Sequence, residues 1–180
     1  RLNFTPKAQA ELYFSPKNKD LFSYPNFTMW AADVSKTGWG GFSALLNEDN
    51  KGWVKVDHHG EGFKNIALNG ERKVPNEHIK KCRQFLSKTF PELENAKLEE
   101  ANICFYNDTD NKNFLIDYHP KYKGLFIASG GSGHSFKFAP LFGELIANTF
   151  ENKKLISKRF LWFSDISVSD PLRTKNNSLE

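Results

Sequence analysis

One stretch of the sequence, Gly130-Gly131-Ser132-Gly133-His134-Ser135-Phe136-Lys137-Phe138, lies between an apolar run at 125–129 and an amphipathic run at 141–150. This order predicts a strand, a glycine-rich turn and the start of a helix. Glycines let backbone amides approach a ligand closely, and a helix N-terminus favours an anion. We therefore interpret the turn as a ligand site.

The spacing within this turn does not identify the ligand. It lacks the P-loop pattern and the Gly-x-Gly-x-x-Gly pattern of a dinucleotide site. Lys137 falls in or near the first helical turn, where a cation opposes the helix dipole. Either an anion lies nearby or Lys137 is an ordinary exposed lysine, and the sequence leaves both open.

The composition is that of a globular domain with one core. Of the 180 residues, 39% are hydrophobic and 26% charged, and 17 Phe and 4 Trp against a single Met indicate a core or cleft built from aromatic rings. The net charge of +4 comes from scattered lysines without a basic cluster beside stacked aromatics, so we expect no nucleic-acid partner. No apolar run approaches the roughly 20 residues of a membrane span, so we expect no membrane partner.

The cysteines also restrict the function. Cys82 and Cys104 are too few for a disulfide framework and lack metal-ligand spacing. We therefore expect free thiols in a reducing compartment and no metal site.

The predicted elements make an α+β fold. Residues 1–26, punctuated by prolines, are interpreted as an edge segment or a connection, and short runs at 27–33, 39–46 and 52–59 predict an antiparallel meander. Residues 75–88 carry apolar positions at helical spacing after a proline, and 98–108 alternate as a strand. We expect an antiparallel mixed sheet with helices, and a frayed tail after residue 163.

The strand at 52–59 carries a polar face. A period of two puts Lys55, Asp57 and His59 on one side and Val54, Val56 and His58 on the other. The polar side is either the wall of a site or a solvent-facing side, which is the commoner case for an antiparallel sheet. His58, among valines, is expected to be packed or at a sheet edge.

The second strand of interest holds a cysteine. In residues 101–107, Ile103 and Phe105 share one face, whereas Cys104 lies on the face of Asn102 and Tyr106. Its thiol is either reactive or buried as a small hydrophobe, and both interpretations stay open. Cys82 belongs to the apolar stripe of its helix and is assigned to the core.

Three motifs together carry a resemblance. In order and separation, Asn102–Thr109, Asn113–Pro120 and Gly131–Phe138 resemble the C-terminal half of the D-amino-acid-oxidase-like flavoproteins. This family includes monomeric sarcosine oxidase, pipecolate and saccharopine oxidases and fructosyl amino acid oxidases. The resemblance runs from about Gly38 to Trp162.

The resemblance implies a role for each matching residue. Cys104 stands where the family attaches FAD covalently, through a thioether to the 8α-methyl carbon. Lys55 stands where a lysine activates dioxygen, and His59 where the sarcosine-oxidase branch has an active-site histidine that contacts substrate. Lys137 stands where a lysine pairs with the substrate carboxylate. The turn residues implied to contact the flavin are Gly131, Ser132, Gly133, His134, Phe136 and Lys137.

The implied reaction is the oxidation of a secondary-amine amino acid. A hydride passes to the flavin, the imine is hydrolysed, and dioxygen is reduced to hydrogen peroxide. Lys55 and His59 favour the sarcosine, pipecolate and saccharopine branch over the fructosyl amino acid oxidases, which tend to carry acidic residues at this strand. A non-catalytic remnant that keeps the fold is the alternative from another class.

The resemblance also divides the chain. It implies a substrate domain over 1–97, a flavin-contacting segment over 98–163 that completes an FAD-binding domain, and a tail over 164–180. The family's Gly-x-Gly-x-x-Gly strand and its N-terminal Arg are absent from these residues. The expected partners are an amino-acid substrate, dioxygen and a missing N-terminal FAD-binding segment, inside the cell in the cytoplasm or peroxisome.

Overall fold

The computed structural model describes residues 3–44, 52–60, 62–63, 70–153 and 157–162. The chain forms two compact units, which we call the sheet unit (residues 8–105) and the hairpin unit (residues 1–7 and 106–180). The expected division at residue 97 concerns functional domains of the whole protein, and it stays a prediction.

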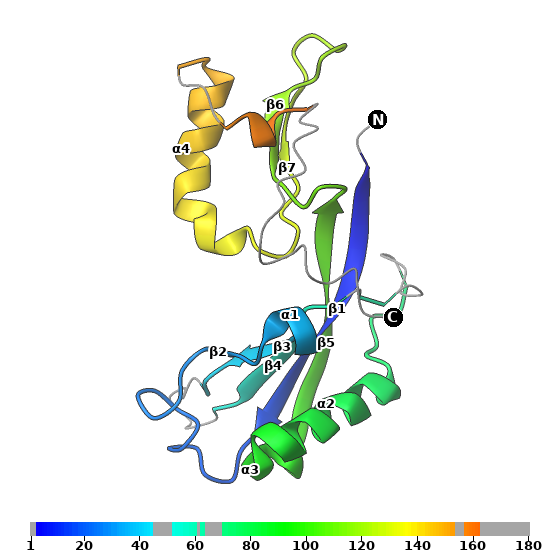
Figure 1. The fold of residues 1–180 in the computed structure, drawn as a ribbon, viewed down its shortest axis with the longest axis vertical. Helices are drawn as coiled ribbons and strands as arrows, with labels where there is room; N and C mark the ends of the chain where they lie inside the picture. The colour runs from blue at the N-terminus through cyan, green and yellow to red at the C-terminus, as the bar shows by residue number, and fades with distance from the viewer. Residues whose placement is uncertain (1–2, 45–51, 61, 64–69, 154–156, 163–180) are drawn as a thin grey trace. The chain divides into compact units, whose positions relative to one another are not determined.

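The sheet unit is built on five strands in the order β2-β3-β4-β1-β5 (Figure 1). Their bounds are β1 Phe4–Ser15, β2 Trp30–Ala31, β3 Trp39–Phe42, β4 Val54–His58 and β5 Lys97–Thr109. The pairs β2–β3, β3–β4 and β1–β4 are antiparallel. The α+β class and the meander are confirmed, although β2 has only two residues and the predicted strand end at 45–46 lies outside the described residues.

The interpretation of residues 1–26 as an edge segment or connection is wrong for residues 4–15, whereas residues 16–26 belong to the connection between β1 and β2. β1 lies between β4 and β5 and is 12 residues long. Its buried side consists of Ala8, Ala10, Leu12 and Phe14, at most 1% exposed. Two of these four residues are alanines, which have low strand propensity. The alternation of apolar and polar residues is therefore only a weak signal for a strand in this segment.

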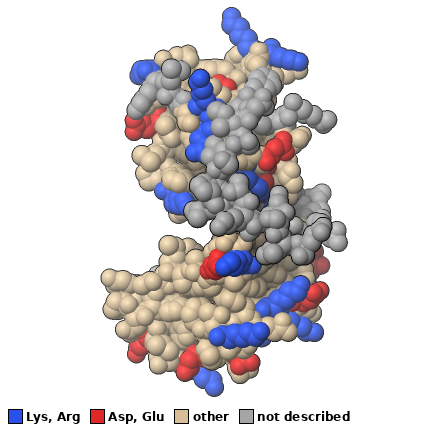
Figure 2. Space-filling model, viewed as in Figure 1, with Lys and Arg blue, Asp and Glu red and all other residues tan. Residues whose placement is uncertain are grey.

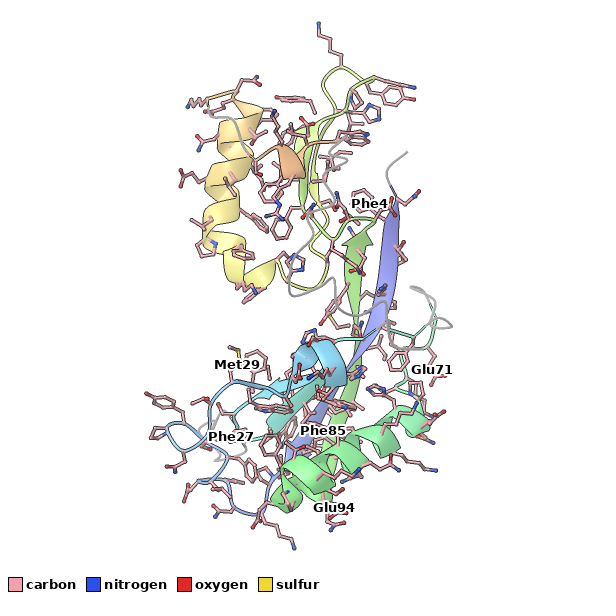
Figure 3. The ribbon with its side chains drawn as sticks, viewed as in Figure 1. Phe4, Phe27, Met29, Glu71, Phe85 and Glu94 are labelled. Carbon is pink, nitrogen blue, oxygen red and sulfur yellow. The ribbon has the colours of Figure 1, made fainter. Side chains whose placement is uncertain are left out.

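Helix α2 (Asn76–Thr89) confirms the predicted helix and covers the apolar side of this sheet (Figure 1). Cys82 and Leu86 on α2 are 0% exposed and join the core with Val54 and Val56 of β4. Figure 3 shows Phe85 between α2 and the strands, where its ring stacks on Trp30 at 6.0 Å. The short helices α1 (Val34–Thr37) and α3 (Pro91–Glu94) complete the unit.

The hairpin unit confirms the predicted strand, turn and helix. β6 (Leu115–Tyr118) pairs antiparallel with β7 (Phe126–Ser129). The glycine turn follows β7, then the 3-10 helix η1 (Phe136–Phe138), α4 (Ala139–Phe150) and a second 3-10 helix, η2 (Lys158–Phe160). Phe114 packs edge-on against Phe142 of α4 at 4.6 Å. The predicted frayed tail lies outside the described residues.

The surface charges in Figure 2 are mixed in sign, and the described helices and metal-ligating side chains show no membrane span or metal cluster. On the face shown in Figure 2, lysine and arginine side chains are interspersed with acidic ones. Across the described residues, no helix combines the length and apolar character needed to cross a bilayer. Within the same residues, no group of three metal-ligating side chains comes together. The absence of a nucleic-acid partner stays a prediction.

Candidate functional site

The side of the sheet opposite the core carries polar groups from three strands. The β1–β4 register pairs Glu11 with Asp57 and Tyr13 with Lys55, so these four side chains share one face. We call this set, together with Cys104 of β5, the polar face. The predicted alternation along β4 is confirmed, since Val54 and Val56 are 0% exposed on the other side.

Lys55 is the centre of an ion cluster on the polar face. Its Nζ lies 2.5 Å from Glu11 Oε1 and 3.7 Å from Asp57 Oδ2. The side chains of Lys55 and Asp57 are only 23% and 11% exposed. A plain solvent-facing strand side would leave such groups in water, so the interpretation as a polar wall is the better of the two.

Lys55 is held as an ammonium ion. Burial by itself would lower the pKa of Lys55, but the hydrogen bond and charge of Glu11, with Asp57 and Tyr13, outweigh it and raise the pKa above its usual value. Its Nζ also lies 5.5 Å from the centre of the Phe42 ring. At neutral pH this face therefore presents a cation of restricted mobility.

His59 extends the cluster beyond the end of β4. Its Nε2 lies 3.1 Å from Asp57 Oδ1, and its backbone N–H donates to Gly38 O at 2.7 Å. Asp57 therefore lies between Lys55 and His59. His58, as expected, is packed on the core side, 4.5 Å from Trp39 and 5.1 Å from His78 between ring centres.

Cys104 is half-buried on the polar face and has a free thiol. Burial raises the pKa of the Cys104 thiol, Glu11 raises it further, and Lys55 opposes the shift. Lys55 and Glu11 are thus its electrostatic neighbours. Cys82 is a core residue, as predicted, since it is 0% exposed and burial raises its pKa to about 12.

The glycine turn in the hairpin unit is fastened to the end of β5. The backbone N–H of Ser132 donates to Asn107 O at 3.1 Å, and the Asn107 side chain donates to Ser129 Oγ at 3.0 Å. Gly133 has φ +74°, and a Cβ there would overlap the Tyr106 ring. The turn backbone therefore follows a path that only glycine allows at this position.

The turn also places the remaining predicted residues. The His134 backbone N–H donates to Gly131 O at 2.9 Å. Phe136 is 92% exposed, and Lys137 is exposed in η1, directly before α4, with its Nζ 5.4 Å from the centre of the Phe138 ring. A cavity of about 400 Å³ opens beside His134 and Phe138 and is lined largely by aromatic and aliphatic side chains.

The predicted site residues therefore form two groups. Lys55, His59 and Cys104 belong to the sheet unit, and the residues from Gly131 to Lys137 belong to the hairpin unit. Sequence reasoning missed Glu11 and Tyr13, because β1 was not recognised as a strand. The alternation of polar and apolar residues from 8 to 14 was the signal that could have found them.

A known protein family matches most of the chain. The family model described as DAO, FAD dependent oxidoreductase, matches residues 8–149. The chain belongs to this family. The match begins well before Gly38 and includes β1 from Ala8 onward, which agrees with the position of β1 inside the sheet.

The chain covers only part of the length of each individual relative. The chain is 34% identical over 100 residues to L-saccharopine oxidase from Schizosaccharomyces pombe, covering 56% of the chain and 21% of that protein. It is 36% identical over 103 residues to peroxisomal sarcosine oxidase from Homo sapiens, covering 53% of the chain and 25% of that protein. Fructosamine oxidase (Amadoriase II) from Aspergillus fumigatus superposes with a TM-score of 0.75 at 26% identity, covering 92% of the chain and 39% of that structure.

The residues present fit FAD, the cofactor of this family. The polar face offers a free, half-buried thiol whose pKa is influenced by the charge of Lys55. The glycine turn offers backbone without side-chain bulk before a 12-residue helix. Both features suit a planar, electron-accepting ring that gains negative charge when it is reduced.

Proposed function

We propose that the protein containing this chain is an FAD-dependent oxidase of secondary-amine amino acids, of the sarcosine, pipecolate or saccharopine kind. The observation that carries the proposal is the polar face, where a half-buried ammonium and the Cys104 thiol are electrostatic neighbours. Relatives named saccharopine oxidase and sarcosine oxidase support the substrate class.

In this proposal Lys55 stabilises the negative charge that develops on dioxygen. An ammonium ion acts more strongly in a half-buried site than in water, because the lower dielectric constant strengthens its field. His59, whose Nε2 lies 3.1 Å from Asp57 Oδ1, would contact the substrate. Lys137 would pair with the substrate carboxylate.

FAD is the cofactor of the proposed reaction. The chemistry it supplies when bound is the uptake of a hydride from carbon and the return of two electrons to dioxygen as hydrogen peroxide. We assign its covalent anchor to Cys104 Sγ, as a thioether to the 8α-methyl carbon. The backbone of Gly131, Ser132, Gly133, His134 and Phe136 would hold the pyrimidine edge of the ring, with residues 1–97 forming most of the substrate domain.

An N-terminal FAD-binding segment would complete the enzyme. The chain spans 21%, 25% and 39% of the three proteins compared above, which supports the need for such a segment. We expect the 180-residue chain alone to retain little or no FAD. Gel filtration after incubation with FAD measures this, and a stoichiometric, acid-stable yellow chain would contradict it.

Peroxide release tests the activity. The full-length protein is assayed with sarcosine, pipecolate and saccharopine, and then as the Lys55→Met and Cys104→Ala variants. We expect Lys55→Met to slow peroxide release by about 10²–10³-fold and Cys104→Ala to remove acid-stable flavin from the protein. Lys81→Met, at a 64% exposed side chain on α2, is the matched control. A protein with neither flavin nor turnover would contradict the proposal.

A fructosyl amino acid oxidase is the second candidate, favoured by the similarity to fructosamine oxidase at 26% identity. The same assay with a fructosyl amino acid separates the two, because the better substrate has the larger kcat/KM. A non-catalytic protein that keeps the fold would give no peroxide with any of these substrates.

We propose the cytoplasm or the peroxisome as the location, and the relative named peroxisomal sarcosine oxidase supports the peroxisome. Imaging of the tagged full-length protein tests this.

A further inference from the structure

Glu11 has no role in the function proposed above, yet both of its carboxylate oxygens are engaged on the polar face. Oε1 lies 2.5 Å from Lys55 Nζ, and Oε2 accepts a hydrogen bond from the Tyr13 hydroxyl at 3.5 Å. The Glu11 side chain is 27% exposed. A partly buried ion pair of this kind is stronger than one on an open surface.

The fold fixes where Glu11 lies. Leu12 and Phe14 are 0% exposed on the core side of β1, and they anchor its register against β4. A slip by one residue would turn these side chains to the polar side. Glu11 and Lys55 are therefore brought together by the packing of the core and not only by their own attraction.

We propose that Glu11 is a positioning residue of the oxidase, whose carboxylate holds Lys55 as an ammonium ion and fixes the place of its Nζ on the polar face. This inference rests on the function proposed for Lys55.

Lys55 needs such a partner because it is partly buried. Burial favours the neutral amine, and a neutral amine cannot stabilise negative charge on dioxygen by its own charge. Asp57 lies farther from Lys55, at 3.7 Å, and also contacts His59. Among the described residues, Tyr13 from β1 and Cys104 from β5 also interact electrostatically with Lys55.

The first test measures the protonation of Lys55 without relying on turnover. Competitive labelling of amines with a small acylating reagent, read by mass spectrometry across pH, gives the apparent pKa of Lys55 in the full-length protein. We expect Glu11→Gln to lower this pKa by about one unit or more, and Glu11→Asp to lower it less. Glu77→Gln removes a 78% exposed carboxylate on α2 and should leave Lys55 unchanged.

The second test follows the two half-reactions separately. As the pH is raised, the rate at which the reduced enzyme reacts with dioxygen should begin to fall at a lower pH in Glu11→Gln than in the wild type. Anaerobic reduction by substrate should change much less. In a Lys55→Arg background the guanidinium stays charged, so Glu11→Gln should no longer shift the pH profile.

The two tests separate this inference from the proposed function. An unchanged Lys55 pKa in Glu11→Gln would overturn the inference even if the enzyme releases peroxide. A lowered pKa would support it even if the wild type proves inactive, which would instead contradict the proposed function. If Glu11→Gln does not fold, Glu11→Ala, which also removes the carboxylate, replaces it, and an unshifted Lys55 pKa there would equally overturn the inference.

Discussion

The two cysteines differ in surroundings although both lie in the sheet unit. Cys82 is 0% exposed with a pKa of about 12, whereas Cys104 is half-buried beside Lys55, which opposes the rise of its pKa. We predict that iodoacetamide modifies Cys104 of the flavin-free protein at least about ten-fold faster than Cys82, because the thiolate is the nucleophile. Peptide mass spectrometry over time measures both rates, and equal rates in the native protein would contradict the assignment.

His78 makes the sheet unit sensitive to acid. It packs against His58, Trp39 and Phe63, and burial, followed by the charges of His58 and Lys81, lowers its pKa from 6.5 to about 4. Between these two values the unfolded chain binds the proton and the folded chain does not. The contribution of His78 to the free energy of unfolding is therefore complete above about pH 6.5 and decreases as the pH falls toward about 4.

Replacement of His78 by Phe tests this contribution. Over the interval from pH 6.5 to 4 we expect His78→Phe to lose about 1 kcal/mol less stability than the wild type, allowing for partial exposure. Urea unfolding followed by tryptophan fluorescence at several pH values provides the comparison. Parallel losses in both proteins would show that His78 is not the acid-sensitive group.

The sequence predicted three of the five residues of the polar face. The two-residue alternation along 53–59 predicted the correct faces for Lys55, Asp57 and the valines, because the period of a strand depends only on local sequence. Glu11 was not predicted, because its position on the polar face depends on the pairing of β1 with β4. This pairing brings Glu11 next to Lys55, which is 44 residues away in the sequence. Local pattern does not report which strands become neighbours.

At the scale of elements, two glycines of the hairpin unit differ in the space that a Cβ atom would find. Gly124 has φ +82° with open space where a Cβ would lie, whereas Gly133 has φ +74° and the Tyr106 ring in that place. We predict that Gly124→Ala costs about 1 kcal/mol, from the backbone alone. Gly133→Ala should cost more, about 2–3 kcal/mol, because Tyr106 must also move.

Hydrogen exchange read by mass spectrometry reports on the turn directly. Peptides that contain residues 126–138 should exchange faster in Gly133→Ala than in Gly124→Ala. Equal exchange in the two variants would mean that contact with Tyr106 does not hold the turn.

Elements with strong local signals were predicted and weak ones were not. Helix α2 and strand β5 carry apolar residues at clear spacing, and both are present with ends within two residues of the prediction. β1 escaped prediction because its buried positions include Ala8 and Ala10, and because prolines at 6 and 16, near its two ends, are typical of turns and connections.

At the scale of the molecule, the residues assigned to one reaction are divided between two compact units. Lys55, His59 and Cys104 belong to the sheet unit and Lys137 to the hairpin unit. β1 and β5 contribute residues to both units. We assign the reaction with dioxygen to the polar face of the sheet unit, where Lys55 lies.

The rate at which the reduced full-length enzyme reacts with dioxygen tests this claim most directly. Stopped-flow mixing compares the wild type with Lys55→Met, which keeps the length of the side chain and removes its charge. We predict a loss of about 10²–10³-fold in this rate, as for removal of a charge-stabilising group, with anaerobic reduction by substrate changed far less. An unchanged rate with dioxygen in Lys55→Met would contradict the account.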